Sequence, residues 1–306
     1  MTGDLPVASV QGSDFGGFEP VEFGAGFTGR VGRLIARLGV LGRAKEGIGL
    51  GHRMGAGEEW LGFRPYRPGD DLRRLDPDLL ARFDKPYVRL TRREASEHWA
   101  LWIDGSASMG VGEGRSKLQA AAELSVALCS LAKRRRARVT LEWTGASPRR
   151  LDLPARMPLE RVLESWSGVR PEGRFGLAER LTEGPGPRAG RWILIGDLEG
   201  LTPGDFLTRI RPGTELLVGA LFAGEELDPD GREASTWTCP ETGDRLSMPA
   251  NERLAGRYEQ AMSRRLEALR LGLGRHRARF AVLDARDPFE THALELASLA
   301  GRGTHR

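Results

Sequence analysis

Short apolar runs alternate with stretches of helical periodicity from residue 98 almost to the end of the chain. The apolar runs have the length and composition of buried strands, and they cover 98–104, 137–143, 191–197, 214–222 and 277–285. Between them, apolar residues recur at every third or fourth position, which predicts helices at 117–135, 158–166, 177–183, 204–210, 250–272 and 288–300. Strands that alternate with helices indicate an α/β fold, with a mainly parallel sheet and helices on both faces.

The N-terminal part follows a different pattern. Residues 1–26 are Gly-rich, acidic and aperiodic, so we expect a flexible lead-in. Residues 27–45 repeat apolar side chains at helical spacing opposite a row of arginines, and such a helix either covers the main domain or lies on an anionic membrane surface. Strand-like pieces follow at 59–63 and 87–91. The pattern therefore divides the chain into a flexible segment (1–26), an N-terminal helix with an Arg- and Asp-rich segment (27–97) and an α/β domain (98–300).

Two of the predicted strands end on an aspartate. The run 98–104 closes with Asp104, and the run 191–197 closes with Asp197. Ligands of open α/β sheets bind beyond the carboxyl ends of the strands. We therefore expect both aspartates at one edge of the sheet, at the place where function resides in such folds.

Two serines follow Asp104 at alternate positions, in the pattern D-x-S-x-S. Asp104, Ser106 and Ser108 could point three oxygens in one direction, and Asp197 could add a second carboxylate. Oxygen ligands of this kind suit Mg²⁺ or Mn²⁺, with water in the remaining positions. The alternative is that Ser106 and Ser108 only cap the helix that follows.

Composition narrows the class of protein. The chain has 306 residues, 40% of them hydrophobic, and a formal net charge of +4. Its densest basic run, KRRRAR at 133–138, follows a predicted helix and is typical of a solvated helix end rather than a nucleic-acid site. Cys129 and Cys239 have no metal-binding spacing. With no signal peptide and no apolar run of membrane-spanning length, we expect a soluble, cytoplasmic protein.

Two further segments carry a family resemblance. RPYRPGDDLRRLD at 64–76 lies within a longer similar stretch, 51–96, and CPETGDRL stands at 239–246. Together with D-x-S-x-S, they resemble the bacterial domain-of-unknown-function family 58 (DUF58), which is similar to von Willebrand factor A domains. The resemblance extends from about residue 46 to residue 300. It implies a von Willebrand factor A-like, Rossmann-like sheet preceded by a small segment that contains strands.

The resemblance also implies a chemistry and a partner. In von Willebrand factor A domains, a metal-ion-dependent adhesion site binds an acidic side chain of a partner protein. Here Asp104, Ser106, Ser108 and Asp197 would hold Mg²⁺ or Mn²⁺ in such a site. The family resemblance further implies a MoxR-type AAA+ ATPase as the partner, in the assembly or maturation of other proteins.

The sequence departs from the family pattern at two positions. Pro77 stands where the family has Trp. Phe175, in the loop 171–181, stands where an adhesion site has a Thr ligand, and neither Thr144 nor Thr182 matches that position. A metal would therefore bind more weakly and with extra water. Paired N-terminal transmembrane helices are common in the family, and no run in this sequence has that character.

The segment 64–76 concentrates charge around a Pro-Gly turn. Asp70 and Asp71 follow the turn and could cap a short helix that carries Arg73 and Arg74. These charges form either a partner-binding surface or clamp beside the metal rim, or an ion-pair network that ties the segment to the sheet. The residues concerned are Arg64, Arg67, Asp70, Asp71, Arg73 and Arg74.

On these grounds the sequence favours a non-catalytic adaptor or co-chaperone that binds protein, with no nucleic-acid partner. The alternative is a Mg²⁺-dependent hydrolase of the phosphatase kind, because such enzymes also place an aspartate at a strand end. A phosphatase would have a second Asp two residues later, where this chain has Ser106. The sequence contains no G-x-x-x-x-G-K-[ST] loop, so the chain is not itself a P-loop ATPase.

Overall fold

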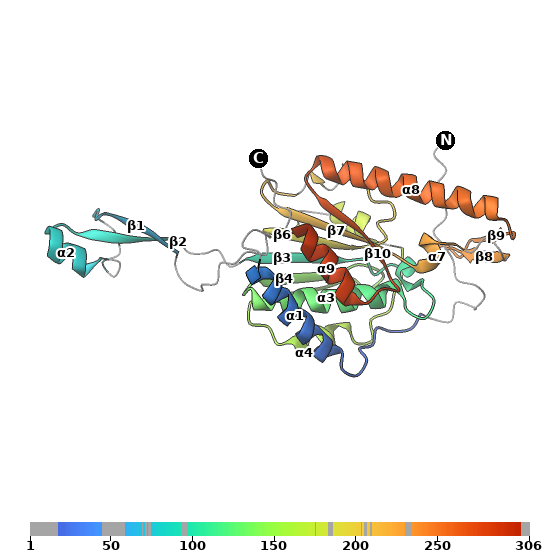
Figure 1. Cartoon of the computed structure of the whole chain (residues 1–306), viewed down its shortest axis with the longest axis horizontal. Coiled ribbons are helices and arrows are strands. Elements are labelled where there is room, and N and C mark those ends of the chain that lie inside the picture. The colour runs from blue at the N-terminus through green and yellow to red at the C-terminus, as the bar shows by residue number, and fades with distance from the viewer. Residues whose placement is uncertain are drawn as a thin grey trace. The chain divides into compact units, whose positions relative to one another are not determined.

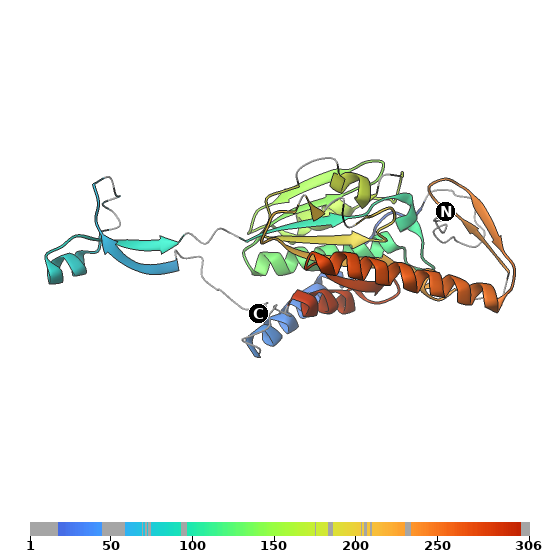
Figure 2. The same ribbon diagram turned by 90° about the horizontal axis from the view of Figure 1, so that it is seen from above.

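The structure is a computed structural model that describes 18–44, 59–68, 70, 72, 75–92, 97–174, 176–182, 186–202, 204, 207–208, 210–229 and 234–300. The chain forms two compact units (Figures 1 and 2). The smaller unit is 52–97, and the larger unit combines 1–51 with 98–306. The N-terminal helix therefore belongs to the larger unit, whereas the sequence pattern had grouped it with the Arg- and Asp-rich segment.

A six-stranded sheet in the order β10-β7-β6-β3-β4-β5 forms the centre of the larger unit. All neighbouring strands are parallel except β5, which runs antiparallel to β4. The mixed α/β architecture with a mainly parallel sheet is thus as predicted, while the edge strand β5 was not predicted. The strands are β3 (His98–Ile103), β4 (Arg138–Trp143), β5 (Arg149–Leu153), β6 (Arg191–Gly196), β7 (Glu215–Phe222) and β10 (Arg279–Asp284).

Helices cover both faces of this sheet. One face packs against α1 (Phe27–Ala44), α3 (Lys117–Arg134), α4 (Leu159–Trp166) and α9 (Phe289–Ala300). The other face packs against α5 (Leu177–Thr182) and α8 (Glu252–Arg275). Three of the seven residues of the predicted helix at 204–210 (205, 206 and 209) lie outside the described residues.

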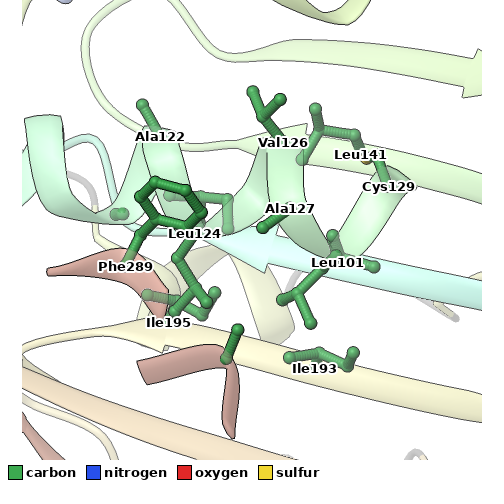
Figure 3. Packing of buried hydrophobic residues seen from close by; sticks show 14 of the residues in the cluster. Leu101, Ala122, Leu124, Val126, Ala127, Cys129, Leu141, Ile193, Ile195 and Phe289 are labelled. Atoms are coloured by element: carbon green, nitrogen blue, oxygen red, sulfur yellow. The ribbon is translucent and has the colours of Figure 1, made fainter. Parts of the chain in front are cut away.

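Successive side chains of the central strand β3 point to opposite faces of the sheet, and each face has its own hydrophobic core. Leu101 of β3 faces the core under α3, whereas Trp102 faces the core under α5 and α8. Figure 3 shows Leu101 in the first core with Leu124 of α3 and Phe289 of α9. Because both faces are covered, the central strands are apolar along most of their length, which is why the sequence pattern predicted them.

Helix α1 packs on the larger unit through its apolar face. Phe27, Val31 and Leu34 are buried, and the ring of Phe27 lies 5.1 Å from that of Phe289 in an edge-on contact. Arg30 forms a two-pronged ion pair with Glu290 of α9 at 2.7 Å. Of the two roles predicted for this helix, the described side chains support packing on the main domain, because the apolar face is covered.

Residues 18–26, part of the predicted flexible lead-in, also pack on the larger unit. The Val21 amide donates to the Val169 carbonyl at 2.8 Å, and the Glu22 amide donates to Gln119 of α3 at 3.0 Å. The expectation of a flexible lead-in is therefore wrong for these residues, while 1–17 lie outside the described chain. Across the described helices, none is both long and apolar enough to cross a membrane.

The smaller unit pairs β1 (Glu59–Pro65) with β2 (Tyr87–Arg92) in antiparallel register and includes the short helix α2 (Pro77–Phe83). The N-cap of α2 is Asp76, whose carboxylate accepts from the amides of Asp78 and Leu79 at 3.1 Å. Pro77 fits here because the first helical position needs no amide hydrogen.

Asp70 was predicted to cap a short helix that carries Arg73 and Arg74, and this cap stays a prediction because both arginines lie outside the described residues. The Asp70 carboxylate binds the Arg64 guanidinium through two contacts of 2.6 Å and accepts from the Arg67 amide at 2.8 Å. This arrangement closes the Pro-Gly turn within the smaller unit. The other residues of the predicted charged cluster, Asp71, Arg73 and Arg74, lie outside the described chain.

Candidate functional site

The two strand-end aspartates lie together. Strands β3 and β6 are parallel neighbours in which Ile103 pairs with Ile195, so both strands end at the same edge. The Asp104 amide continues the ladder and donates to the Ile195 carbonyl at 2.9 Å. Asp104 and Asp197 are each only 2% exposed. Two carboxylates are thus buried side by side at the carboxyl edge of the sheet.

Ser106 and Ser108 face these carboxylates rather than the hydrophobic core. The Ser106 hydroxyl donates to Asp104 Oδ1 at 2.6 Å and lies 3.0 Å from the Ser108 hydroxyl. Asp197 lies close enough that interaction with the Ser108 hydroxyl contributes to lowering the pKa of its carboxyl group. The four residues of the predicted metal site therefore form one cluster, which we call the rim.

Helix capping does not explain these serines. Ser106 precedes the short 3₁₀ turn η2 (Ala107–Gly110), but its side chain makes no capping hydrogen bond to that turn. The following helix, α3, has its own cap in Ser116, whose hydroxyl accepts from the Gln119 amide at 3.1 Å. The hydroxyls of the rim are thus directed at carboxylates.

Two glycines provide the space that the Asp104 side chain occupies. A Cβ at Gly196 would lie 2.6 Å from the Cβ of Asp104, closer than such atoms approach. A Cβ at Gly176 would lie 3.1 Å from Asp104 Oδ2. The next amide, of Leu177, donates to the same oxygen at 3.3 Å. The backbone therefore closes around the carboxylate on two sides.

Asp104 is a buried carboxylate without a basic partner. Burial, and then repulsion by Asp197, raise the pKa of Asp104 to about 6, against the hydrogen bonds from Ser106. No Lys, Arg or His of the described chain forms an ion pair with it. Buried charges are normally paired or bound to a metal.

Asp197, by contrast, has a buried cation. Lys117, in the first turn of α3, has a fully buried side chain whose Nζ lies 3.0 Å from Asp197 Oδ2 and 2.9 Å from Glu226 Oε1. Burial alone would raise the pKa of Asp197, but the Lys117 ammonium and the hydrogen bonds from Ser108 and Lys117 outweigh it and lower that pKa. Neither Lys117, which looks in the sequence like a surface residue at a helix start, nor Glu226 was predicted as a site residue.

The charges of this buried group suit a divalent cation. Asp104, Asp197 and Glu226 carry three negative charges when ionised, and Lys117 carries one positive charge, which leaves two negative charges. The donors at the rim are two carboxylates and two hydroxyls, a set that Mg²⁺ and Mn²⁺ accept when water fills the other positions. Within the described chain, no three His, Cys, Asp or Glu side chains are arranged to hold a metal, so carboxylates alone would not suffice.

Thr144, which had been set aside because of its position, adjoins the rim. Its hydroxyl accepts from the Gly105 amide at 3.1 Å and donates to Asp104 Oδ1 at 3.5 Å. The Thr182 hydroxyl donates to the Glu179 carbonyl of its own helix at 2.7 Å and forms no hydrogen bond with the rim among the described residues. Phe175, the predicted replacement for a Thr ligand, lies outside the described chain.

One further acidic residue, Glu241, lies near the rim although it is distant in the sequence. It lies in the turn between the short antiparallel strands β8 (Ser235–Thr238) and β9 (Arg245–Met248). Burial, and then repulsion by Asp197 and Asp104, raise the pKa of its carboxyl group to about 7, and its backbone carbonyl accepts from Arg174 Nε at 2.9 Å. The sequence signal was the CPETGDRL segment, which carries the family resemblance but was not predicted to lie near the site.

Two of three comparisons relate this chain to known proteins. Residues 62–221 match the family model described as "Protein of unknown function DUF58". A comparison with curated proteins gives no match. Among solved structures, the conserved hypothetical protein BatB from Bacteroides thetaiotaomicron aligns with a TM-score of 0.39 and 13% identity. An aerotolerance-related membrane protein from Bacteroides fragilis aligns with a TM-score of 0.40 and 12% identity. Each alignment covers 68% of this chain and 100% of the other.

Proposed function

Since the chain belongs to the DUF58 family, we propose its function from the chemistry of the rim: a non-catalytic, cation-dependent protein-binding adaptor. In this proposal the sheet is a von Willebrand factor A-like domain. Asp104, Ser106, Ser108 and Asp197 hold Mg²⁺ or Mn²⁺, and the bound ion accepts a carboxylate from a partner protein. The ion serves as a link between two proteins, because it attracts the partner's negative charge.

The observation that carries this proposal is the buried Asp104 carboxylate without a basic partner. An asparagine would keep an acceptor for Ser106 without a buried charge, although its amide nitrogen could not accept from the Leu177 amide as Asp104 Oδ2 does. A bound cation would compensate the buried negative charge of a carboxylate at this position. Lys117 meanwhile keeps Asp197 ionised and correctly placed.

The geometry favours binding over hydrolysis. A phosphatase-type enzyme would need an acid two residues after Asp104 to transfer a proton. Ser106 occupies that position, and its hydroxyl donates to Asp104 itself. The proposal therefore assigns no catalytic residue.

For the partner, the proposal follows the family resemblance to a MoxR-type AAA+ ATPase, in the assembly or maturation of other proteins. Such an ATPase depends on cytoplasmic ATP, so the proposal places the adaptor in the cytoplasm. An acidic side chain on the surface of the ATPase, or of its substrate, would complete the ion's shell.

The direct test is thermal unfolding with increasing Mg²⁺ or Mn²⁺. A ligand that binds only the folded state stabilises it by RT ln(1 + [L]/Kd), roughly 2.7 kcal/mol at a hundredfold excess over Kd. We expect the unfolding temperature of the wild type to rise with cation and that of Asp104→Ala to stay constant. The control is Asp287→Ala, which removes an exposed acid beyond another strand end and should keep the rise. A wild type that does not respond to either ion contradicts the proposal.

A further inference from the structure

A small pocket beside α5 has no part in the proposed function. Its cavity volume is about 30 Å³. We call it the indole pocket, and its lining includes the side chains of Trp102, Trp192, Arg150, Arg180, Leu181 and Pro187. None of these residues belongs to the rim, so the two sites are separate in the residues that form them.

The register of the sheet brings the side chains of the indole pocket together. Trp102 of β3 pairs with Glu142 of β4, which pairs with Arg150 of β5, so these three lie in one row on one face. Trp192 of β6 pairs with Ala100, two residues before Trp102, and therefore points to the same face. The two indole rings lie 5.4 Å apart. The pocket is thus built on the sheet itself.

The polar side chains of this lining are hydrogen-bond donors only. Guanidinium and indole groups donate and do not accept. Trp102 is 3% exposed, and its Nε1 is buried without a hydrogen-bond partner within the described part of the chain. A buried donor that lacks an acceptor is costly. The indole pocket is therefore suited to a ligand that brings acceptor atoms.

The charges at the pocket favour an acceptor that is negative. The Arg180 guanidinium lies 5.8 Å from the ring of Trp102, and its Nε donates to Glu142 Oε1 at 2.5 Å. Arg150 binds the exposed Asp152 through contacts of 3.2 and 3.3 Å. Exposed ion pairs contribute little to stability. Arg150 can therefore turn from Asp152 to an anionic ligand at a low cost.

The size of the indole pocket restricts the anion. One water molecule needs roughly 10–15 Å³ of such a cavity, so about 30 Å³ takes two atoms of that size. The two oxygens of a carboxylate match this space, whereas a phosphate group carries more oxygens and needs more room. Leu181 and Pro187 add apolar surface to the lining, which suits a short apolar stem behind the carboxylate.

We propose that the indole pocket is a second binding site, for a carboxylate on a short apolar stem. One carboxylate oxygen accepts from Trp102 Nε1, and the other faces the Arg150 guanidinium. A free short-chain acid and a glutamate side chain of another protein both carry this group. The inference goes beyond the proposed function, because binding here needs neither the rim nor a cation.

The test follows the indole N–H signals of the ¹⁵N-labelled full-length protein by NMR, in EDTA, while propionate is added. We expect the Trp102 indole proton to shift downfield and to saturate, because Nε1 gains an acceptor. Trp102→Phe identifies that signal. Trp166 is the internal control: its Nε1 is also buried without a partner among the described residues, but its ring stacks on Trp143 in the other core. Its signal should not move.

Arg150→Ala should weaken propionate binding roughly tenfold, the usual effect of losing one charge-assisted hydrogen bond. The matched control is Arg149→Ala, an exposed neighbour in β5 whose side chain alternates to the other face, and it should bind as the wild type does. Propionamide, which has the same shape without the charge, should leave the Trp102 signal nearly unchanged.

A blocked Gly-Glu-Gly peptide distinguishes the two sources of the carboxylate. Tighter binding of the peptide than of propionate supports a protein ligand, and binding of propionate alone supports a free acid. No saturable shift of Trp102 with either probe, or equal shifts with propionate and propionamide, would overturn the inference. Because EDTA removes divalent cations, this result is independent of the Mg²⁺ response that tests the proposed function.

Discussion

Lys117 and Asp197 form an ion pair in which the Nζ–Oδ2 distance is 3.0 Å and neither side chain is more than 2% exposed. Burial alone would lower the pKa of Lys117, but Asp197 and Glu226 together raise it, so the ammonium stays charged. One helix residue thereby neutralises part of a carboxylate cluster built from three other segments. The site is organised around this fixed cation.

Replacing Lys117 with Met should be strongly destabilising. Methionine fills a similar volume, but Asp197 and Glu226 would remain buried without their cation. Loss of one partner of a buried pair costs roughly 3–5 kcal/mol in the free energy of unfolding. Urea unfolding at neutral pH measures this loss. Lys133→Met, at an exposed position of the same helix, should change stability by less than about 0.5 kcal/mol. A small loss for Lys117→Met would show that the carboxylates are already protonated or hydrated.

The pH dependence of stability should reveal the uncompensated Asp104 carboxylate. Its pKa is about 6 in the folded protein, above the unfolded value of roughly 3.9. Between these values the folded state binds more protons, so the free energy of unfolding falls as pH rises from about 4 to 6 and then levels off. Asp104→Asn should lose this component, on the order of 3 kcal/mol, and be more stable than the wild type at pH 8 without cation.

Urea unfolding at several pH values, in EDTA and in excess Mg²⁺, measures that component as the difference between wild type and Asp104→Asn. Saturating Mg²⁺ should remove the disadvantage of the wild type at high pH. Asp287→Asn, at an exposed position, should follow the wild type throughout. A difference that does not vary with pH would mean that Asp104 remains ionised over this whole range.

Thr144 should contribute to both stability and cation binding. Thr144→Val keeps the shape but leaves the buried Gly105 amide without its acceptor, which costs about 1–3 kcal/mol. It also removes a hydroxyl beside Asp104, so we expect a smaller rise in unfolding temperature with Mg²⁺. Thr182→Val, at an exposed helix end, is the matched control and should change neither quantity appreciably. Equal effects of the two substitutions would argue against a role for Thr144 at the rim.

The elements that the sequence predicted well are those whose environment is uniform along their length. Strand β6 (Arg191–Gly196) is buried at every position, so its apolar run alone marked it. Edge strand β5 (Arg149–Leu153) alternates charged and apolar residues at an exposed edge and gave no such signal. The residues of the site likewise divide into those that the sequence predicted and those that it did not. Asp104 and Asp197 follow from strand ends, but the burial of Lys117 depends on Glu226, which lies 109 residues away in the chain.

Gly196 tests whether the space around Asp104 is essential. A methyl group there would lie 2.6 Å from the Cβ of Asp104 and 3.1 Å from Leu177 Cδ1, so Gly196→Ala must push the carboxylate or the strand aside. Overpacking of this kind costs typically 1–3 kcal/mol. Because the displaced group is the proposed cation ligand, we expect the Mg²⁺-dependent rise in unfolding temperature to shrink as well. Gly190→Ala, just before the same strand, places its methyl group in open space and should be neutral or slightly stabilising. If Gly196→Ala lowers stability but leaves the full Mg²⁺ response, then Asp104 keeps its position by moving with the strand.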